Sequence, residues 1–239
     1  MKSFDEVFSE RKSVRKYTGR RISRELKATI LDAAMRAPTA GNLMLYSIIE
    51  VEDKAVKRRL SVTCDNQPFI AGAPWVLVFL ADYQRMVDCF QLAGAGAGHT
   101  RRRPAEADLL LACCDALIAA QTAVVAAEAY GLGSCYIGDI MENYEAHRDL
   151  LSLPRYVFPI TMVCLGFPTA QQRKRRQPTR FPRRIVVHRD VYRSITRADM
   201  EEMYQPAAEE VLALYQRKFT ADFSVEMRRS VRKMLENWR

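Results

Sequence analysis

The segment Arg11-Lys12-Ser13-Val14-Arg15 holds the residues with the clearest capacity for chemistry in this sequence. Guanidinium groups and a hydroxyl can together bind a phosphate through charge-assisted hydrogen bonds. In an extended chain Arg11, Ser13 and Arg15 project to the same side, because successive side chains alternate. A solvated basic surface is the alternative interpretation. A run of five such residues, taken alone, more often forms a surface of that kind. The segment is therefore a candidate phosphate site.

Other motifs for chemistry are absent or incomplete. The glycines of Gly94–Gly98 do not have the spacing of a dinucleotide fingerprint, and no Walker, HExxH or GxSxG sequence occurs. The six cysteines lack CxxC spacing, and the three histidines are not spaced with them as in a zinc site. We therefore expect no metal, reduced thiols in the core, and a mobile loop at Gln91–Pro104.

Five segments resemble, in the same order, motifs of the FMN-dependent nitroreductase family. They are Arg11–Tyr17 (RKSVRKY), Ala33–Asn42 (AAMRAPTAGN), Ala73–Val78 (APWVLV), Gly131–Gly138 (GLGSCYIG), and Leu165–Pro168 (LGFP) followed by Lys174–Arg176 (KRR). Each is weak alone, but their shared order over roughly residues 5–185 makes a strong joint signal. Gln67, Tyr136–Gly138 and the long C-terminal part are most similar to the larger NADPH-preferring branch, which includes oxygen-insensitive nitroreductases and flavin reductases.

The resemblance implies that the chain binds FMN and that its basic segments hold the phosphate. Arg11, Lys12, Ser13, Lys174 and Arg176 would neutralise the phosphate and donate hydrogen bonds to it. Without the resemblance, the last two would be interpreted as part of a solvated loop.

Two further residues are implied at the flavin ring. Arg15 is expected near the N1/O2 edge, where reduction leaves negative charge that a fixed guanidinium stabilises. Gln67 can both donate and accept, which fits the pyrimidine edge of the ring. A glutamine in a surface loop is an equally good interpretation of Gln67 from the sequence alone.

The turn that follows the predicted strand Ser134–Ile137 is expected to face flavin N5, the atom that accepts hydride. Tyr136 and Ile137 lead into Gly138 and Asp139, whose backbone N–H groups the resemblance places near N5. Glycine permits a close approach of the backbone to the ring. Asp139 departs from the family, which usually has Glu-Gly or Gly-Gly at this pair, so its carboxylate could alter the substrate preference or cap the following helix.

A second group of residues is expected to reach the cofactor from a partner subunit. Pro38, Thr39, Ala40 and Asn42 resemble the turn that packs on FMN across the family's dimer interface. The stretch Asp108–Tyr130 is rich in Ala and Leu and has few charges, which predicts a helix buried over most of its circumference. The resemblance makes this helix part of the interface of a homodimer, with the FMN sites between the subunits.

Periodicity and turn residues indicate the elements that must position these side chains. We expect strands at Tyr46–Val51, Pro74–Ala81, Ser134–Ile137 and Pro159–Gly166, and helices at Met1–Arg11, from Ser23 to Pro38, at Asp53–Val62, Asp108–Tyr130, Thr196–Tyr215 and Phe223–Trp238. Residues 1–239 contain no linker or repeat and are predicted to form one α+β domain, with residues 190–239 as a C-terminal helical extension. The resemblance implies a central mixed, mainly antiparallel sheet flanked by helices.

The composition is that of a globular chain that binds an anion. Of the 239 residues, 49% are hydrophobic and 27% charged, and the net charge is +9. Basic residues cluster at Arg11–Arg21, Arg101–Arg103, Arg173–Arg184 and Arg228–Arg232, which favours a phosphorylated or otherwise anionic partner. The N-terminus lacks the apolar core of a signal peptide, and Ala71–Ala81, taken as the most apolar stretch, is too short to cross a bilayer. We therefore expect a soluble, cytoplasmic protein.

Together these features predict a homodimeric FMN oxidoreductase. NADPH or NADH would reduce FMN at N5 and leave, and a nitroaromatic, a quinone or free flavin would then take the electrons in a ping-pong cycle. Arg101–Arg103 and Arg217-Lys218 are candidates for contact with the 2′-phosphate of NADPH. The expected partners are a second copy of the chain and a small aromatic acceptor, with neither nucleic acid nor membrane.

Two alternatives stay open. Asp139 and the insertion Gln91–Pro104 are compatible with a flavin-binding redox protein of the same fold that lacks general turnover with NAD(P)H. The basic clusters are also compatible with a nucleic-acid-binding module, which would show strongly salt-dependent binding and no flavin. No nucleic-acid recognition motif supports that second alternative.

Overall fold

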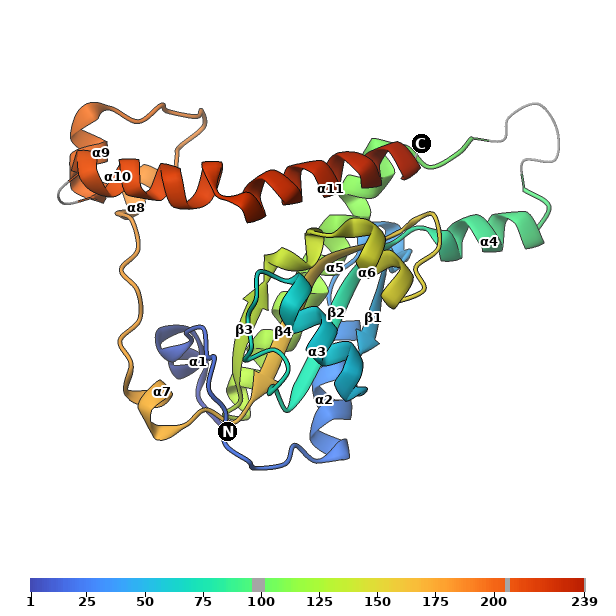
Figure 1. Ribbon diagram of the computed structural model, residues 1–239, viewed down its shortest axis with the longest axis horizontal. Coiled ribbons are helices and arrows are strands. Elements are labelled where there is room, and N and C mark those ends of the chain that lie inside the picture. The colour runs from blue at the N-terminus through green and yellow to red at the C-terminus, as the bar shows by residue number, and fades with distance from the viewer. Residues whose placement is uncertain (96–101, 205–206, 239) are drawn as a thin grey trace.

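A four-stranded antiparallel sheet forms the centre of the computed structural model, which describes residues 1–95, 102–204 and 207–238 (Figure 1). The strands are β1 (Tyr46–Glu50), β2 (Trp75–Asp82), β3 (Gly133–Ile137) and β4 (Val157–Gly166), in the spatial order β1-β2-β4-β3. All neighbouring strands are antiparallel, and an isolated bridge between Ser13 and Ser134 adds a parallel contact. The prediction of a mainly antiparallel sheet flanked by helices is confirmed.

Two helices, α2 (Arg24–Met35) and α5 (Glu106–Ala129), cover one face of the sheet. Ser23 caps α2 by accepting a hydrogen bond from the N–H of Leu26, as its sequence predicts. α5 meets the sheet through small side chains, all fully buried: Ala116, Ala119, Ala120, Ala123 and Ala127. These alanines allow the helix axis to come close to the strands.

The opposite side of α5 is apolar and exposed in the single chain. Leu110, Leu111, Leu117 and Ile118 are between 40% and 66% exposed, so the prediction that most of the helix circumference is buried does not hold within one chain. α5 also has the length and composition of a membrane span, a property that the sequence argument, limited to Ala71–Ala81, overlooked. Its packing against the sheet is that of a core helix.

Shorter elements cover the other face of the sheet. They are α3 (Lys54–Thr63), which Asp53 caps, the 3-10 turn η2 (Gly138–Met141), and α6 (Tyr144–Leu150). All six cysteines are free, but only three of them, Cys64, Cys135 and Cys164, are buried, and these belong to this second core. Cys89 and Cys114 are exposed, so the prediction of core thiols is correct only in part.

The C-terminal part leaves the sheet and returns to it. After α7 (Ala170–Lys174) come α8 (Arg183–Val186), α9 (Arg197–Met203), α10 (Ala207–Tyr215), the π-helical η3 (Gln216–Thr220) and α11 (Asp222–Trp238). The predicted helix Thr196–Tyr215 is instead divided into α9 and α10. In Figure 1, α8, α9 and α10 stand apart from the sheet and α11 returns above it. There Met234 and Trp238 join a core cluster with Leu109 and Phe158.

Two further helices complete the fold. α1 (Phe4–Glu10) begins with a capping box formed by Ser3 and Glu6, and α4 (Gln84–Leu92) follows β2. The i, i+3, i+4 spacing of Phe4, Val7 and Phe8 places them on one face of α1, but only Val7 is buried, whereas Phe4 and Phe8 are exposed and their rings are tilted against each other with centroids 4.8 Å apart. The sequence argument did not predict α4 or α6.

Candidate functional site

The Arg11–Arg15 segment is extended and runs beside β3. The N–H of Val14 donates to the carbonyl oxygen of Ser134 at 2.8 Å. The Tyr17 hydroxyl donates to the carbonyl oxygens of Val14 (2.8 Å) and Cys164 (3.1 Å), which ties the end of the segment to β4. The backbone of the candidate phosphate site is therefore fixed by the sheet.

Two glycines make room for this segment. A Cβ atom on Gly133 would lie 2.5 Å from Cγ2 of Val14, and one on Gly166 would lie 2.7 Å from Cδ1 of Tyr17. Real side chains do not approach so closely, so any larger residue would push the segment off the sheet. Gly133 and Gly166, which belong to the last two motifs, are thus required for the first motif to pack against the sheet.

The basic segment that begins at the end of α7 lies against the Arg11–Arg15 segment. Nζ of Lys12 donates to the carbonyl oxygens of Arg173 (2.8 Å) and Arg175 (2.7 Å). The Arg175 guanidinium donates in return to the carbonyl oxygen of Ser13 at 3.0 Å. The Gln177 amide adds a bond of 2.7 Å to the backbone of the first segment. The structure thereby brings two of the basic clusters together.

The side chains predicted to hold the phosphate differ in what they contact. Lys12 binds the chain itself, through the two carbonyls just described, and its assignment to a ligand stays a prediction. By contrast, four other groups make no hydrogen bond or ion pair within the described residues. They are the guanidinium groups of Arg11 and Arg176, the ammonium of Lys174 and the hydroxyl of Ser13. These four groups remain able to bind an anion.

Arg15 contacts the turn that follows α3. Its guanidinium carbon lies 6.0 Å from the centroid of the Phe69 ring. Burial raises the pKa of Cys135 on β3, and the charge of Arg15 together with a hydrogen bond from it opposes that rise. The backbone N–H of Arg15 donates to Oε1 of the buried Gln172 at 3.2 Å. Arg15 is therefore held between β3 and the 64–70 turn.

Gln67 and Asp139 meet at the end of β3. Nε2 of Gln67 donates to Oδ2 of Asp139 at 2.7 Å and to the carbonyl oxygen of Cys64 at 3.1 Å. Both N–H groups of the amide are thus used, and its Oε1 is the atom left to accept from a ligand. Asp139 lies inside η2 and does not cap the following helix, which begins after Asn143. Gly138 is exposed, and a Cβ there would meet no atom within 4 Å.

Two buried groups support η2 from the interior. The ring nitrogens of His147 lie 2.9 Å from the carbonyl oxygen of Ile140 and 2.7 Å from Oγ1 of Thr63, and burial lowers the pKa of this histidine. Glu142 is only 4% exposed. Burial, followed by the neighbouring carboxyl of Asp139, raises the pKa of Glu142 to about 8. Sequence reasoning missed both residues.

Tyr136 and Ile137 direct their side chains away from this group. The Tyr136 hydroxyl donates to Oε1 of Gln121 on α5, on the other face of the sheet, at 3.2 Å. Ile137 is 1% exposed and belongs to the core beneath α3. Only the backbone of these two residues is left to face a ligand beside Gly138.

The turn Pro38–Asn42 lies at the opposite edge of the sheet. Its 3-10 part, η1 (Ala40–Asn42), is held by Asp115 of α5, whose carboxylate accepts from the N–H groups of Ala40 (3.0 Å) and Leu45 (3.1 Å). β1 follows this turn directly, whereas the Arg11–Arg15 segment runs along β3, with β2 and β4 in between. Within one chain the structure does not bring the turn to the other predicted cofactor residues.

Comparison with known proteins identifies the family of this chain. The sequence profile described as the Nitroreductase family matches residues 8–167. The chain belongs to the nitroreductase family. Curated relatives include an oxygen-insensitive NADPH nitroreductase from Salmonella typhimurium, 31% identical over 88% of this chain and 78% of the relative. They also include an FMN reductase (NAD(P)H) from Bacillus subtilis, 32% identical over 77% of this chain and 72% of the relative.

Solved structures agree over nearly the whole chain. Nitroreductase A from Vibrio parahaemolyticus superposes with a TM-score of 0.83 at 28% identity and covers 100% of this chain and 97% of its own. The NADPH:FMN oxidoreductase from Vibrio harveyi, solved in complex with NAD+, superposes with a TM-score of 0.78 at 26% identity and covers 96% of each chain. The match includes the C-terminal helices, which the family profile does not reach.

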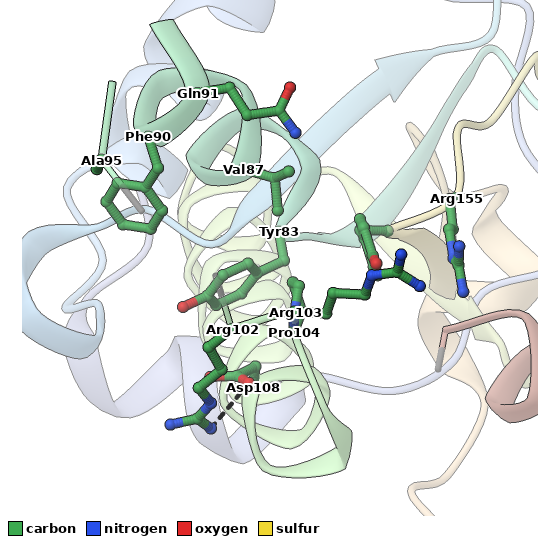
Figure 2. Close-up of a pocket in the computed structure, with 11 residues that line it drawn as sticks. Tyr83, Val87, Phe90, Gln91, Ala95, Arg102, Arg103, Pro104, Asp108 and Arg155 are labelled. Atoms are coloured by element: carbon green, nitrogen blue, oxygen red, sulfur yellow. Dashed lines mark hydrogen bonds and ion pairs between the residues drawn. The ribbon is translucent and has the colours of Figure 1, made fainter. Parts of the chain in front are cut away.

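A pocket of about 480 Å³ lies away from the candidate site of this nitroreductase-family chain (Figure 2). The residues that line it include Tyr83, Phe90, Arg102, Arg103 and Arg155. Arg102 forms an ion pair of 3.3 Å with Asp108. The pocket adjoins the end of β2, whereas the Arg11–Arg15 segment lies level with its start, about 23 Å away along the strand. None of the predicted cofactor residues lines this pocket.

The basic residues proposed for the NADPH phosphate are thus scattered. Arg102 and Arg103 line the pocket near α4, and Arg101 lies outside the described residues. Arg217 and Lys218 are exposed on η3, where the Lys218 ammonium lies 5.1 Å from the Phe223 ring centroid. The structure does not bring either group to the Arg11–Arg15 segment.

Several residues that build the candidate site belong to no motif in the sequence. Arg175 and Gln177 hold the two basic segments together, and Gln172 holds the backbone of Arg15. Nothing local distinguishes them from other polar residues of a basic loop. Asp115 did carry a signal, because it is an isolated carboxylate in the middle of an apolar helix and such a group needs partners.

Proposed function

We propose that this chain is an FMN-dependent oxidoreductase that takes hydride from NADPH or NADH and passes electrons to nitroaromatics, quinones or free flavin. The observation that carries the proposal is the junction of the two basic segments, which leaves Arg11, Ser13, Lys174 and Arg176 uncommitted at one place. The names of its relatives agree, since they include an NADPH nitroreductase, FMN reductases and a Cr(VI) reductase from a Pseudomonas strain.

The donor set at this junction fits a phosphate dianion. Three cationic side chains and one hydroxyl supply both the charge and the hydrogen-bond donors that such a group requires. Lys12 and Arg175 hold the two segments together through backbone carbonyls, so the donors are in place before a ligand binds. A preorganised site of this kind loses less entropy on binding than a flexible one.

Residues around η2 fit the flavin ring. FMN, when bound, supplies the atom that accepts hydride, so the protein has only to orient the reactants and shape the electrostatics. Arg15 would stabilise negative charge at the N1/O2 edge, and Oε1 of Gln67 would accept from the pyrimidine N–H. The open surface above Gly138 leaves room for the ring, and the backbone of Gly138 and Asp139 would face N5.

We infer that two chains share each site. The Pro38–Asn42 turn and the Arg11–Arg15 segment lie at opposite edges of one sheet, so both can contact one FMN only if the turn comes from a second copy. The exposed apolar side of α5 supports a homodimer, because Leu110, Leu117 and Ile118 would be covered by the partner.

The dimer can be tested with a charge on that side of α5. Ile118→Glu should produce a monomer that has lost FMN, because burying an unpaired carboxylate is unfavourable. The matched control is Val62→Glu on α3, an exposed aliphatic position outside the proposed interface that should tolerate a charge. Light scattering and bound-flavin absorbance report the outcome. A monomeric wild type that is fully loaded with FMN and active would exclude the shared site.

The activity itself is tested with the purified full-length chain. It should carry FMN, bleach under anaerobic NADPH or NADH, and recover its colour with a quinone, with the parallel double-reciprocal plots of a ping-pong cycle. Failure of the bound flavin to bleach with either nucleotide would leave only the flavin-binding alternative. We propose further that the enzyme acts in the cytoplasm as a single domain over residues 1–239, without nucleic acid or membrane as a partner.

A further inference from the structure

The carboxyl group of Glu142 is buried directly behind the proposed flavin site. Glu142 follows η2 by one residue and is 4% exposed. Its Oε1 has no hydrogen-bond partner within the described residues. A buried carboxyl without a partner is costly in its charged form. None of the sequence motifs includes this residue, and the proposed FMN site does not use it.

Acidic groups surround Glu142 on three sides. Asp139 of η2 lies within hydrogen-bonding reach of it, and Asp65, after α3, and Glu226 of α11 add negative charge. The cation on this side is Arg229 of α11, which is already bound to Glu226 (2.8 Å) and to a further glutamate of α6. The electrostatic surroundings therefore oppose a negative charge on Glu142.

His147, a further neighbour, does not supply a positive charge. His147 of α6 lies beneath η2 and makes hydrogen bonds to Thr63 and to the carbonyl of Ile140, and its lowered pKa keeps the ring neutral. Arg59 of α3 acts on His147 in the same direction. Burial and the acidic neighbours together raise the pKa of Glu142 to about 8, so its carboxyl holds a proton at neutral pH.

Asp139 connects this buried proton to the surface. Its carboxyl is half-buried, faces Glu142 on one side, and accepts a hydrogen bond of 2.7 Å from Gln67 on the other. Gly138, next to it, is exposed and has open space above its backbone. A continuous route thus runs from Glu142 through Asp139 to the place where the proposed function puts the reacting ring.

We propose that Glu142 stores a proton and that Asp139 delivers it to the electron acceptor during reduction. The inference rests on the proposed function. The acceptor gains two electrons and one hydrogen as hydride and becomes an oxyanion. The O–H bond of Glu142 breaks as one forms on Asp139. The O–H bond of Asp139 then breaks as one forms on the acceptor oxygen, and solvent returns a proton to the Glu142 carboxylate.

The stored proton can be measured without any turnover. In full-length protein labelled with 13C at the glutamate carboxyls, one resonance should titrate near pH 8, and it should disappear in Glu142→Gln. The matched control, Glu236→Gln on α11, removes an exposed carboxyl paired with Lys233 and should leave that resonance unchanged. A wild type in which every glutamate titrates near its ordinary pKa would overturn the proposal, whatever the activity of the enzyme.

Delivery of the proton is tested in the oxidative half-reaction. Enzyme loaded with FMN is reduced anaerobically and mixed with a quinone, and reoxidation is followed from pH 6 to pH 9. The wild-type rate should fall above about pH 8, whereas Glu142→Gln should be slower by about 100-fold with no such fall, since a positioned acid typically contributes that much. Glu236→Gln should behave as the wild type does.

A second variant separates proton delivery from a structural role. Asp139→Asn interrupts the route but leaves burial, the largest cause of the raised pKa of Glu142, in place, so the rate should fall while the Glu142 resonance still titrates above its ordinary pKa. Equal rates and equal pH profiles in Glu142→Gln, Asp139→Asn and wild type would overturn the proposal. A wild type that binds FMN but is not reduced by NADPH or NADH would instead defeat the proposed function, and chemical reduction would still allow the reoxidation test.

Discussion

Lys12 offers a direct test of how the cofactor site is held together. Its ammonium donates to two backbone carbonyls, those of Arg173 and Arg175, at 2.8 and 2.7 Å. Lys12→Met keeps the length of the side chain but removes both bonds, so the segment that carries Lys174 and Arg176 should separate from the first basic segment. We expect FMN affinity to fall although Lys12 does not touch the phosphate.

The size of the effect follows from the exposure of these bonds. A buried hydrogen bond to a charged group contributes about 1.5–3 kcal/mol, but exposed ionic contacts contribute less than about 1 kcal/mol. At about 1 kcal/mol for each of the two bonds, Lys12→Met should weaken FMN about 30-fold. Lys16→Met is the matched control, because Lys16 is exposed and its side chain makes no hydrogen bond or ion pair within the described part of the chain.

Two measurements distinguish a structural lysine from a ligand contact. Flavin fluorescence titration gives the affinities for FMN and for riboflavin, which lacks the phosphate and should be affected little. Amide hydrogen exchange over residues 170–177 should become faster in Lys12→Met but not in Arg11→Ala, which removes only a phosphate contact. If Lys12→Met weakens FMN and leaves this exchange unchanged, Lys12 binds the phosphate directly and the argument from the carbonyl contacts is wrong.

Three further changes test other parts of the site. Gly133→Ala should weaken FMN and lower stability by about 1–3 kcal/mol, because its Cβ would collide with Val14; flavin titration and denaturant unfolding would show both. Arg15→Gln should retain FMN but lower its two-electron potential by about 30 mV for each 1.4 kcal/mol of lost stabilisation, as spectroelectrochemistry would measure. Glu142 has an ordinary pKa of 4.5 and one of about 8 in the folded chain, so the folded state binds the extra proton and stability falls as pH rises between these values. Unfolding of Glu142→Gln at pH 5 and pH 8 should show this fall reduced by about 3–4 kcal/mol relative to wild type.

Much of the fold could be predicted because its signals are local. The continuous apolar run Pro74–Ala81 became β2, the strand buried on both faces, and Ser23 caps α2 as its position suggests. Local signals do not determine whether a face is buried, as α1 shows. Periodicity identified an apolar face containing Phe4 and Phe8, but it cannot say whether the same chain covers that face, and here the chain leaves it exposed.

The candidate site was harder to predict because its residues act through contacts between distant segments. Four basic residues follow one another from Arg173 at the end of α7, and the sequence cannot say which of them binds the chain and which is left for a ligand. That division depends on the bend at the end of α7, which turns Arg175 toward the carbonyl of Ser13 and leaves Lys174 and Arg176 without such a contact. The role of Gly133 is likewise visible only once Val14 is packed against it.

The C-terminal helix α11 is part of the chemistry as well as the fold. Oε1 of its Glu226 accepts from the N–H of Asn143 at 3.1 Å, and Oγ of its Ser230 accepts from the N–H of Tyr144 at 2.9 Å. These bonds hold α11 over the residues that follow η2, where it excludes water from Glu142. Since burial is the largest cause of the raised pKa of Glu142, a loosened α11 would hydrate that carboxyl and release its proton at neutral pH. Under the proposal, the extension beyond the family profile therefore helps to hold the proton on Glu142.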